Sequence, residues 1–140
     1  MIVDLTGKAI TELLANAGVT AIVGQKVRGE WAVGEGPPGV LIRQLGTTYN
    51  LGPGTRRLGL QVPMLAALCY GVTRPQASQL GNAVVEAVNM RGPRKDASGR
   101  LVLASLVEGG GDVELDPDTK WPFATVTFRL IGAQQAVAVA

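Results

Sequence analysis

The sequence predicts an α+β fold, in which two main helices pack on one face of a mostly antiparallel sheet within a single domain spanning residues 1–140. Two stretches carry apolar residues at helical spacing, and several others alternate in the manner of strands. Their order, α-β-β-β-α-β-β, lacks the regular strand-helix-strand repetition that builds parallel sheets. With 140 residues, 46% of them hydrophobic, the chain has the usual size of one domain with a sizeable core.

The first helix is predicted over Asp4–Asn16, with Asp4 or Thr6 as the capping residue and Gly18 just beyond its end. Its apolar residues recur every three or four positions, as on a helix with one buried side: Leu5, Ala9, Ile10, Leu13 and Leu14. The next segment, Val19–Val23, is too short to assign. A short strand is predicted over Val27–Trp31, before the glycine- and proline-rich break at 34–39.

A long hairpin is predicted next, because Val40–Leu45 alternates and Leu58–Tyr70 is the longest extended candidate. The glycine- and threonine-rich segment Gly46–Arg57 is expected to be the loop between them. Pro63 cannot donate a hydrogen bond within a sheet, so the second strand should be an edge strand, bulged or broken at that point.

The clearest helix is predicted over Thr73–Asn89. Thr73 can cap it and Pro75 suits its first turn. A single stripe carries the apolar residues expected in the core: Ala77, Leu80, Val84, Ala87 and Val88.

The last third of the chain is expected to hold two strands, Leu101–Val107 and Phe123–Ile131. Before them, Arg91–Gly99 is expected to be a polar, basic turn. Between them, Glu108–Pro117 is expected to be a loop that leads into a turn at residues 116–119. Residues 132–140, small and apolar, are either a flexible tail or a segment that adds a strand to a neighbouring subunit.

Composition lowers the expectation of an enzyme. The chain has no histidine, the commonest general base and transition-metal ligand, and its single cysteine, Cys69, lies in an apolar run typical of a buried thiol. We expect no catalytic residues, no cofactor and no metal. Charged residues make up only 17% of the chain, which favours self-association. No stretch is long and apolar enough for a membrane helix and no secretion signal is recognisable, so we expect a protein made in a reducing cytoplasm.

Three motifs resemble ligand sites only superficially. Gly52–Arg57 lacks the ending of a nucleotide-binding loop, and Gly109–Asp112 lacks the spacing of a dinucleotide fingerprint. The alternating carboxylates of Asp112, Glu114, Asp116 and Asp118 suit calcium chemically, but Pro117 interrupts them and they do not match a helix-loop-helix site.

Basic and aromatic residues supply the candidate interaction sites. The densest basic cluster comprises Arg91, Arg94, Lys95 and Arg100, which are candidates for lining a channel or for salt bridges; with only 4% aromatic residues, a DNA-binding module is less favoured. Candidates for contacts with other subunits or partners are Trp31, Tyr49, Arg56, Arg57 and Trp121. Each tryptophan, placed beside a loop, is either a lid over the sheet edge or an interface anchor.

The order of these patterns from about Ile10 to Leu130 resembles the tail-terminator, or tail-completion, proteins of long-tailed bacteriophages. The resemblance rests on the first helix, the strand entered through Pro38-Gly39-Val40, the extended stretch ending at Cys69-Tyr70, the helix Thr73–Asn89, and the segment Asp118–Phe123 before the last strand. It is a likeness of layout, without a catalytic signature.

The resemblance implies a virion protein at the junction of tail and neck, assembled in the host cytoplasm. Six subunits would form a ring that caps the tail tube, ends its polymerisation and joins the tail to the head connector. The implied partners are further copies of the chain, the tail tube protein and the head-connector or neck protein, with DNA passing through the ring. Alternatives are a neighbouring neck or head-completion connector, or a small basic DNA-binding module.

Overall fold

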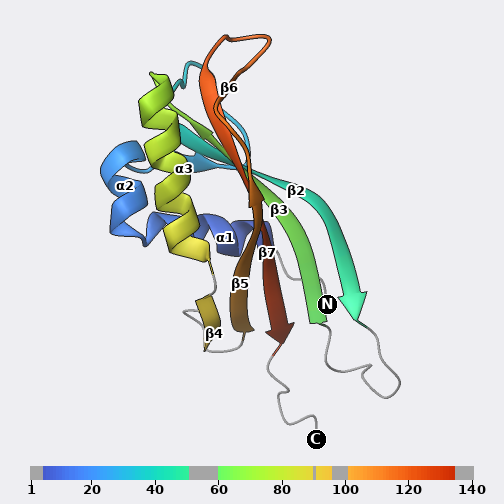
Figure 1. Ribbon diagram of the computed structural model, residues 1–140. Helices are drawn as coiled ribbons and strands as arrows, with labels where there is room; N and C mark the ends of the chain where they lie inside the picture. Colours follow the sequence, from blue (N-terminus) through green and yellow to red (C-terminus); the bar gives the residue numbers. More distant parts are fainter. Residues whose placement is uncertain (1–4, 51–59, 90, 96–100, 135–140) are drawn as a thin grey trace, which may run out of the picture.

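The computed structural model describes residues 5–50, 60–89, 91–95 and 101–134 (Figure 1). Within these ranges the helices are α1 (Leu5–Leu14), α2 (Ala17–Val23) and α3 (Arg74–Val88). The strands, in chain order, are β1 (Val27–Arg28), β2 (Gly39–Asn50), β3 (Leu60–Tyr70), β4 (Arg91–Lys95), β5 (Leu101–Gly110), β6 (Glu114–Leu115) and β7 (Pro122–Gln134). The predicted α+β class is confirmed.

The strands form one sheet in the order β1-β2-β3-β7-β5-β4. Every pairing is antiparallel except that of β1 with β2, so the sheet is mixed. Phe123 of β7 pairs with Tyr70 of β3 on one side and with Glu114 of β6 on the other, so β6 lies along the same side of β7 as β5. The predicted hairpin is β2–β3, and Figure 1 shows its strands, with β5 and β7, running on past the end of α3.

One face of the sheet, called the inner face here, packs against the helices. Because residues paired across neighbouring strands point to the same side, Ile42, Ala67 and Val126 share this face. They enter one core cluster with residues from all three helices, among them Leu13, Val19 and Leu80. The core therefore lies between the sheet and the helices.

The helix α3 forms where the sequence predicts it. Thr73 is its N-cap, with its hydroxyl accepting a hydrogen bond from the Gln76 amide (3.3 Å), and Pro75 lies in the first turn. All five residues of the predicted apolar stripe are buried: Ala77, Leu80, Val84, Ala87 and Val88. Capping and periodicity along the sequence are therefore sufficient to predict this element.

Two segments near the N-terminus and in the hairpin differ from the sequence expectation. Val19–Val23, too short to assign, is part of α2, whose start is capped by Asn16 Oδ1 accepting from the Val19 amide (3.1 Å). Gly46–Asn50, predicted as loop, extends β2 by pairing with β3. Residues 51–59 of the predicted loop lie outside the described ranges.

Pro63 does not lie on an edge strand, because β3 is flanked by β2 and β7. β3 is also unbroken. Pairing with β7 stops at Gln61 and resumes at Met64, and the neighbouring strand β2 has a bulge between Gln44 and Gly46. The missing donor is thus accommodated by a local irregularity inside the sheet.

Two further expectations for the last third of the chain are wrong. Arg91–Lys95 forms the edge strand β4, paired with β5, and is not a turn. Glu108–Gly110 belongs to β5, and β6 interrupts the predicted loop. Residues 132–134 are part of β7, while 135–140 of the predicted tail lie outside the described ranges. No helix in the described part of the chain is long and apolar enough to cross a membrane.

Leu80→Ala should lower the free energy of unfolding by about 2 to 5 kcal/mol, because the side chain is fully buried between α3 and the sheet and truncation leaves a cavity. Gln79→Ala, on the exposed side of the same helix, should change it by less than about 0.5 kcal/mol. Urea unfolding followed by circular dichroism measures both. Equal effects of the two substitutions would contradict the placement of the core.

Candidate interaction surface

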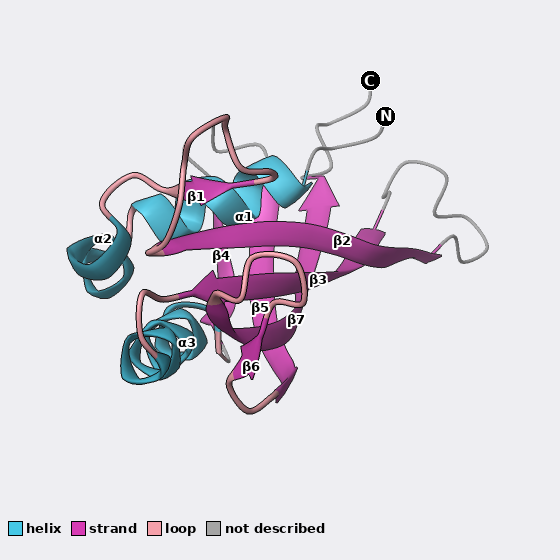
Figure 2. Ribbon diagram, turned by 90° about the horizontal axis from the view of Figure 1, so that it is seen from above, coloured by secondary structure: helices cyan, strands magenta, loops and turns pink. Residues whose placement is uncertain are grey.

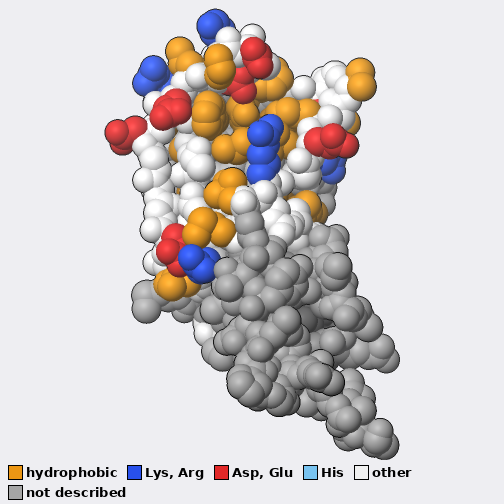
Figure 3. All heavy atoms as spheres, turned by 90° about the vertical axis from the view of Figure 1, so that its right-hand side faces the viewer, with side chains coloured by type: hydrophobic (Ala, Val, Ile, Leu, Met, Phe, Trp, Pro, Cys, Tyr) orange, Lys and Arg blue, Asp and Glu red, His pale blue; other side chains and the backbone are white. Residues whose placement is uncertain are grey.

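The second face of the sheet, called the outer face here, carries no helix in the described structure. Its rows follow from the register: Leu41, Leu68 and Thr125 lie side by side, and the next row contains Arg43 and Thr127. Figure 3 shows this side of the molecule, where hydrophobic side chains gather in the upper part with a basic side chain among them and charged groups toward the margins. This surface is the candidate site of interaction.

An aromatic cluster covers one end of the outer face. It consists of Trp31, Tyr70, Trp121 and Phe123. Trp31, Tyr70 and Trp121 meet edge to face, with ring centroids 5.5 to 6.2 Å apart, and Tyr70 lies 5.3 Å from Phe123. These are favourable geometries for aromatic pairs, so four residues from three separate segments stabilise this end of the sheet together.

Two glycines make room for the tryptophans. The Trp31 ring lies so close to Gly39 that a Cβ there would meet ring atoms at 2.4 and 2.7 Å. Trp121 lies over Gly36, where a Cβ would be 3.6 Å from its ring. Gly36 and Gly39, in the glycine- and proline-rich segment 34–39, therefore leave the space in which the two tryptophan rings pack.

The segment between β1 and β2 is held by charged groups. Arg28 Nε and Nη2 donate to Glu35 Oε1 and Oε2 at 3.2 and 3.0 Å, and Oε1 also accepts from the Ala32 amide at 2.8 Å. Hydrogen bonding to Arg28, followed by that to Ala32, lowers the pKa of Glu35, and the same pair raises the pKa of Arg28. Lys26 Nζ donates to the Gly36 carbonyl (3.0 Å), which anchors the far side of the segment.

A second loop is tied to the cluster through Tyr70. Its hydroxyl donates to Asp116 Oδ2 (3.0 Å), while Asp116 Oδ1 accepts from the amides of Asp118 and Thr119. The predicted turn at 116–119 is thereby confirmed. The backbone hydrogen bonds from Thr119 and Asp118 are the largest causes that lower the pKa of Asp116. Burial, followed by the hydrogen bond to Asp116, raises the pKa of Tyr70 to about 12.

Farther along the outer face, the side chains are charged rather than aromatic. Arg129 of β7 forms a salt bridge with Glu108 of β5 (Nε to Oε1, 2.7 Å). Arg43 is exposed on β2, and Leu106 of β5 is 42% exposed beside Arg129. Arginine is enriched in protein–protein interfaces, so Arg43 and Arg129 make this part of the face a candidate contact surface.

The sheet also has open edges. β1 pairs only with Val40 and Leu41, so no described strand lies beside the outer edge of β2 from Ile42 to Asn50. β4 is the last strand at the other edge. Unpaired edges can add a strand of another chain.

The candidate residues of the sequence fall into separate places. Trp31 and Trp121 come together as a lid over the end of the sheet, each still partly exposed. The backbone of Tyr49 lies in β2, and the backbones of Arg91, Arg94 and Lys95 lie in β4 at the opposite edge. Arg56, Arg57 and Arg100 lie outside the described ranges. The tryptophans and the basic strand therefore do not form one site.

Sequence reasoning did not place Tyr70 and Phe123 in a site, and it considered Asp116 only as one of several alternating carboxylates and as the start of a turn. The available signal was the alternation of side chains along each strand. Positions 69 and 124 face the core, so their neighbours Tyr70 and Phe123 point to the opposite face of the sheet. Cys69 is buried, as expected, and burial raises its pKa to about 12, so its thiol stays protonated at neutral pH. Among the described residues, no group of carboxylates and thiols is arranged to hold a metal ion.

The described part of the chain is an α+β fold with helices on one sheet face and none on the other, and comparison with solved structures finds a chain with a similar overall fold. A chain in a structure titled "Virion of native gene transfer agent (GTA) particle" superposes with a TM-score of 0.55 at 16% sequence identity, over 89% of this chain and 91% of that one. The two chains share a fold. No family model and no curated protein matches the sequence.

Gly39→Ala should displace the Trp31 ring, because the added methyl group overlaps it, and should cost about 1 to 3 kcal/mol of stability. In a Trp121→Phe background Trp31 is the sole tryptophan, and its fluorescence should shift to longer wavelength. Gly29→Ala is the matched control, since nothing lies within 4 Å of a Cβ there. An unshifted spectrum for Gly39→Ala would refute the packing of Trp31 on Gly39.

Stability should fall as the pH rises from about 10 to about 12, partly through Tyr70. In the folded chain its pKa is raised to about 12, while in the unfolded chain it lies near 10, so only the unfolded state loses this proton in that window. Tyr70→Phe should remove this part of the decline, whereas Tyr49→Phe should retain it. Urea midpoints across the pH range test this, and identical profiles for wild type and Tyr70→Phe would count against it.

Proposed function

We propose that this chain is a non-enzymatic structural subunit of a phage-like particle, of the tail-terminator kind. Copies of it assemble into a ring, of six by the family resemblance, at the junction between tail and neck. The ring caps the tail tube, ends its polymerisation and joins the tail to the head connector. The subunit needs no cofactor.

The observation that carries the proposal is the end-to-end likeness of fold to a chain from a gene transfer agent virion, spanning nine tenths of both chains. It agrees with the layout of the sequence, which by itself resembles tail terminators.

The surface supports an assembly role. The chain combines an outer sheet face without helices with two open sheet edges in its described part. Exposed large hydrophobic residues are spread around it: Val33, Leu45, Val72, Leu106 and Leu115. Isolated exposed groups of this kind are common on folded proteins, so the support for assembly comes from the open face and the open edges.

The first test measures the mass of the purified chain by native mass spectrometry, with and without isolated tail tubes. The proposal expects a closed ring, either free in solution or formed only on the tubes, because a template can stabilise an interface that is weak in solution. A chain that remains monomeric and ignores the tubes would contradict it and favour a neck connector.

A DNA-binding module predicts a different result, namely salt-sensitive binding to a random duplex that is lost on replacing Arg91, Arg94 and Arg100 by alanine. The structural-subunit proposal expects those three substitutions to leave duplex binding unchanged. Fluorescence anisotropy at two salt concentrations distinguishes the two functions.

A further inference from the structure

Among the large hydrophobic residues whose exposure the structure describes, Val33 is the most exposed, and it lies at the tip of a tight turn between β1 and β2. We propose that Val33 is an anchor that inserts into a groove beside α3 on a second copy of the chain. This inference rests on the proposed function, since it states how neighbouring subunits recognise each other.

Val33 lies in a turn formed by residues 32–35, called the Val33 turn here. Two hydrogen bonds between its first and last residues close this turn. The Glu35 amide donates to the Ala32 carbonyl (3.0 Å), and the Glu35 carboxylate accepts from the Ala32 amide (2.8 Å). Gly34 has φ +83°, a conformation that favours glycine. A fully exposed apolar side chain on a turn this well bonded loses little conformational freedom on binding, which suits an anchor.

The neighbours of the turn are fixed as well. Arg28 holds Glu35 through two hydrogen bonds, and Trp31, next to Ala32, is pinned in the aromatic cluster. Val33 thus has its backbone fixed by contacts of its flanking residues, while its own side chain has no role in the core. The valine side chain is therefore free to contact another chain.

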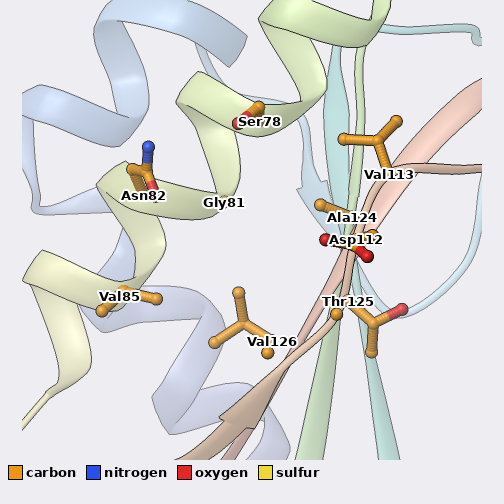
Figure 4. A pocket seen from close by; sticks show the side chains of 11 residues that line it. Ser78, Gly81, Asn82, Val85, Asp112, Val113, Ala124, Thr125 and Val126 are labelled. Carbon is orange, nitrogen blue, oxygen red and sulfur yellow. The ribbon is translucent and has the colours of Figure 1, made fainter.

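The groove lies between α3 and the end of β5 with β7, and has a volume of about 210 Å³ (Figure 4). Its floor is made by small or apolar buried residues, Gly81, Ala124 and Val126, with Val85 and Val113 as walls. The space exists because glycine faces alanine: a Cβ at position 81 would lie 3.4 Å from that of Ala124. This floor suits a branched aliphatic side chain such as valine.

The polar groups at the two places are complementary. The groove is bordered by the exposed carboxylate of Asp112, which has no partner among the residues the structure describes. The amides of Val33 and Gly34 likewise donate to no other described residue, so the turn offers hydrogen-bond donors where the groove offers an acceptor. The charges of Lys26 and Arg28 near the turn are balanced by Glu30 and Glu35, so the complementarity rests on these two amides and the Asp112 carboxylate.

The two features lie on different sides of the subunit. The Val33 turn follows Trp31, which packs on the outer face at the β1–β2 edge, whereas the groove is on the inner face beside α3 and β7. Figure 2 shows the loop between β1 and β2 on the far side of β2 from α3. A contact between two such different surfaces is heterologous, so repeating it generates a ring where the rotation closes.

Val33→Asp should weaken self-association by at least about tenfold, the usual effect of losing a central anchor. Val72→Asp, which alters another exposed valine, is the matched control and should leave it unchanged. On the groove side Asn82→Tyr should block the site, whereas Gln79→Tyr, exposed on α3 but outside the groove, should not. Analytical ultracentrifugation measures association, and circular dichroism confirms that each variant folds.

Cross-linking tests the contact directly. When Val33→Cys protein is mixed with Asn82→Cys protein and oxidised, disulfide-linked heterodimers should exceed either homodimer, and Val72→Cys mixed with Asn82→Cys should give none above background. The natural Cys69 is buried and does not interfere. Tail tubes are included if wild type assembles only on them.

The outcomes separate this inference from the proposed function. Wild type that assembles while Val33→Asp and Asn82→Tyr assemble equally well would overturn the contact and leave the ring subunit standing. Wild type that stays monomeric, with and without tubes, would overturn both. Loss of assembly in both variants, retained assembly in both controls and a selective cross-link would establish the contact.

Discussion

In the part of the chain that the structure describes, helices cover only one of the two faces of the sheet, and the rest of the structure follows from that constraint. On the inner face, Leu80 of α3 and Phe128 of β7 are fully buried, and this burial holds the domain together. No described helix covers the outer face, which is instead occupied by side chains of the strands and loops. The aromatic cluster covers one end of it, and the remainder carries Leu41 and Leu68 together with threonines, arginines and a salt bridge.

The aromatic cluster also organises the loops that meet it. Through Trp31 it orders the segment between β1 and β2, and through the hydrogen bond from Tyr70 to Asp116 it orders the turn before β7. A protein with few aromatic residues thus concentrates four of them at one place. The result is a rigid end of the molecule, from which the Val33 turn projects.

Local signals predicted much of the fold. Thr73, Pro75 and the apolar stripe of α3 act within one helix, so the sequence alone places that helix to within a residue or two. The second half of β2 and all of β4 were missed for the opposite reason. Gly46–Asn50 and Arg91–Lys95 are polar or glycine-rich, and they are strands because β3 and β5 offer them partners. Strand formation of this kind depends on neighbours distant in sequence.

The sequence by itself determined the α+β class, the two long helices, the β2–β3 hairpin and the buried thiol of Cys69, because these depend on periodicity, capping and apolar runs along short stretches of chain. Only the tertiary structure decided that Trp31, Tyr70, Trp121 and Phe123 meet, that Asp116 accepts from Tyr70, and that a groove forms where Gly81 faces Ala124. Their partners lie up to about ninety residues apart, and the register of the sheet brings them together. No short-range pattern encodes that register, since it results from the combined burial of the whole inner face.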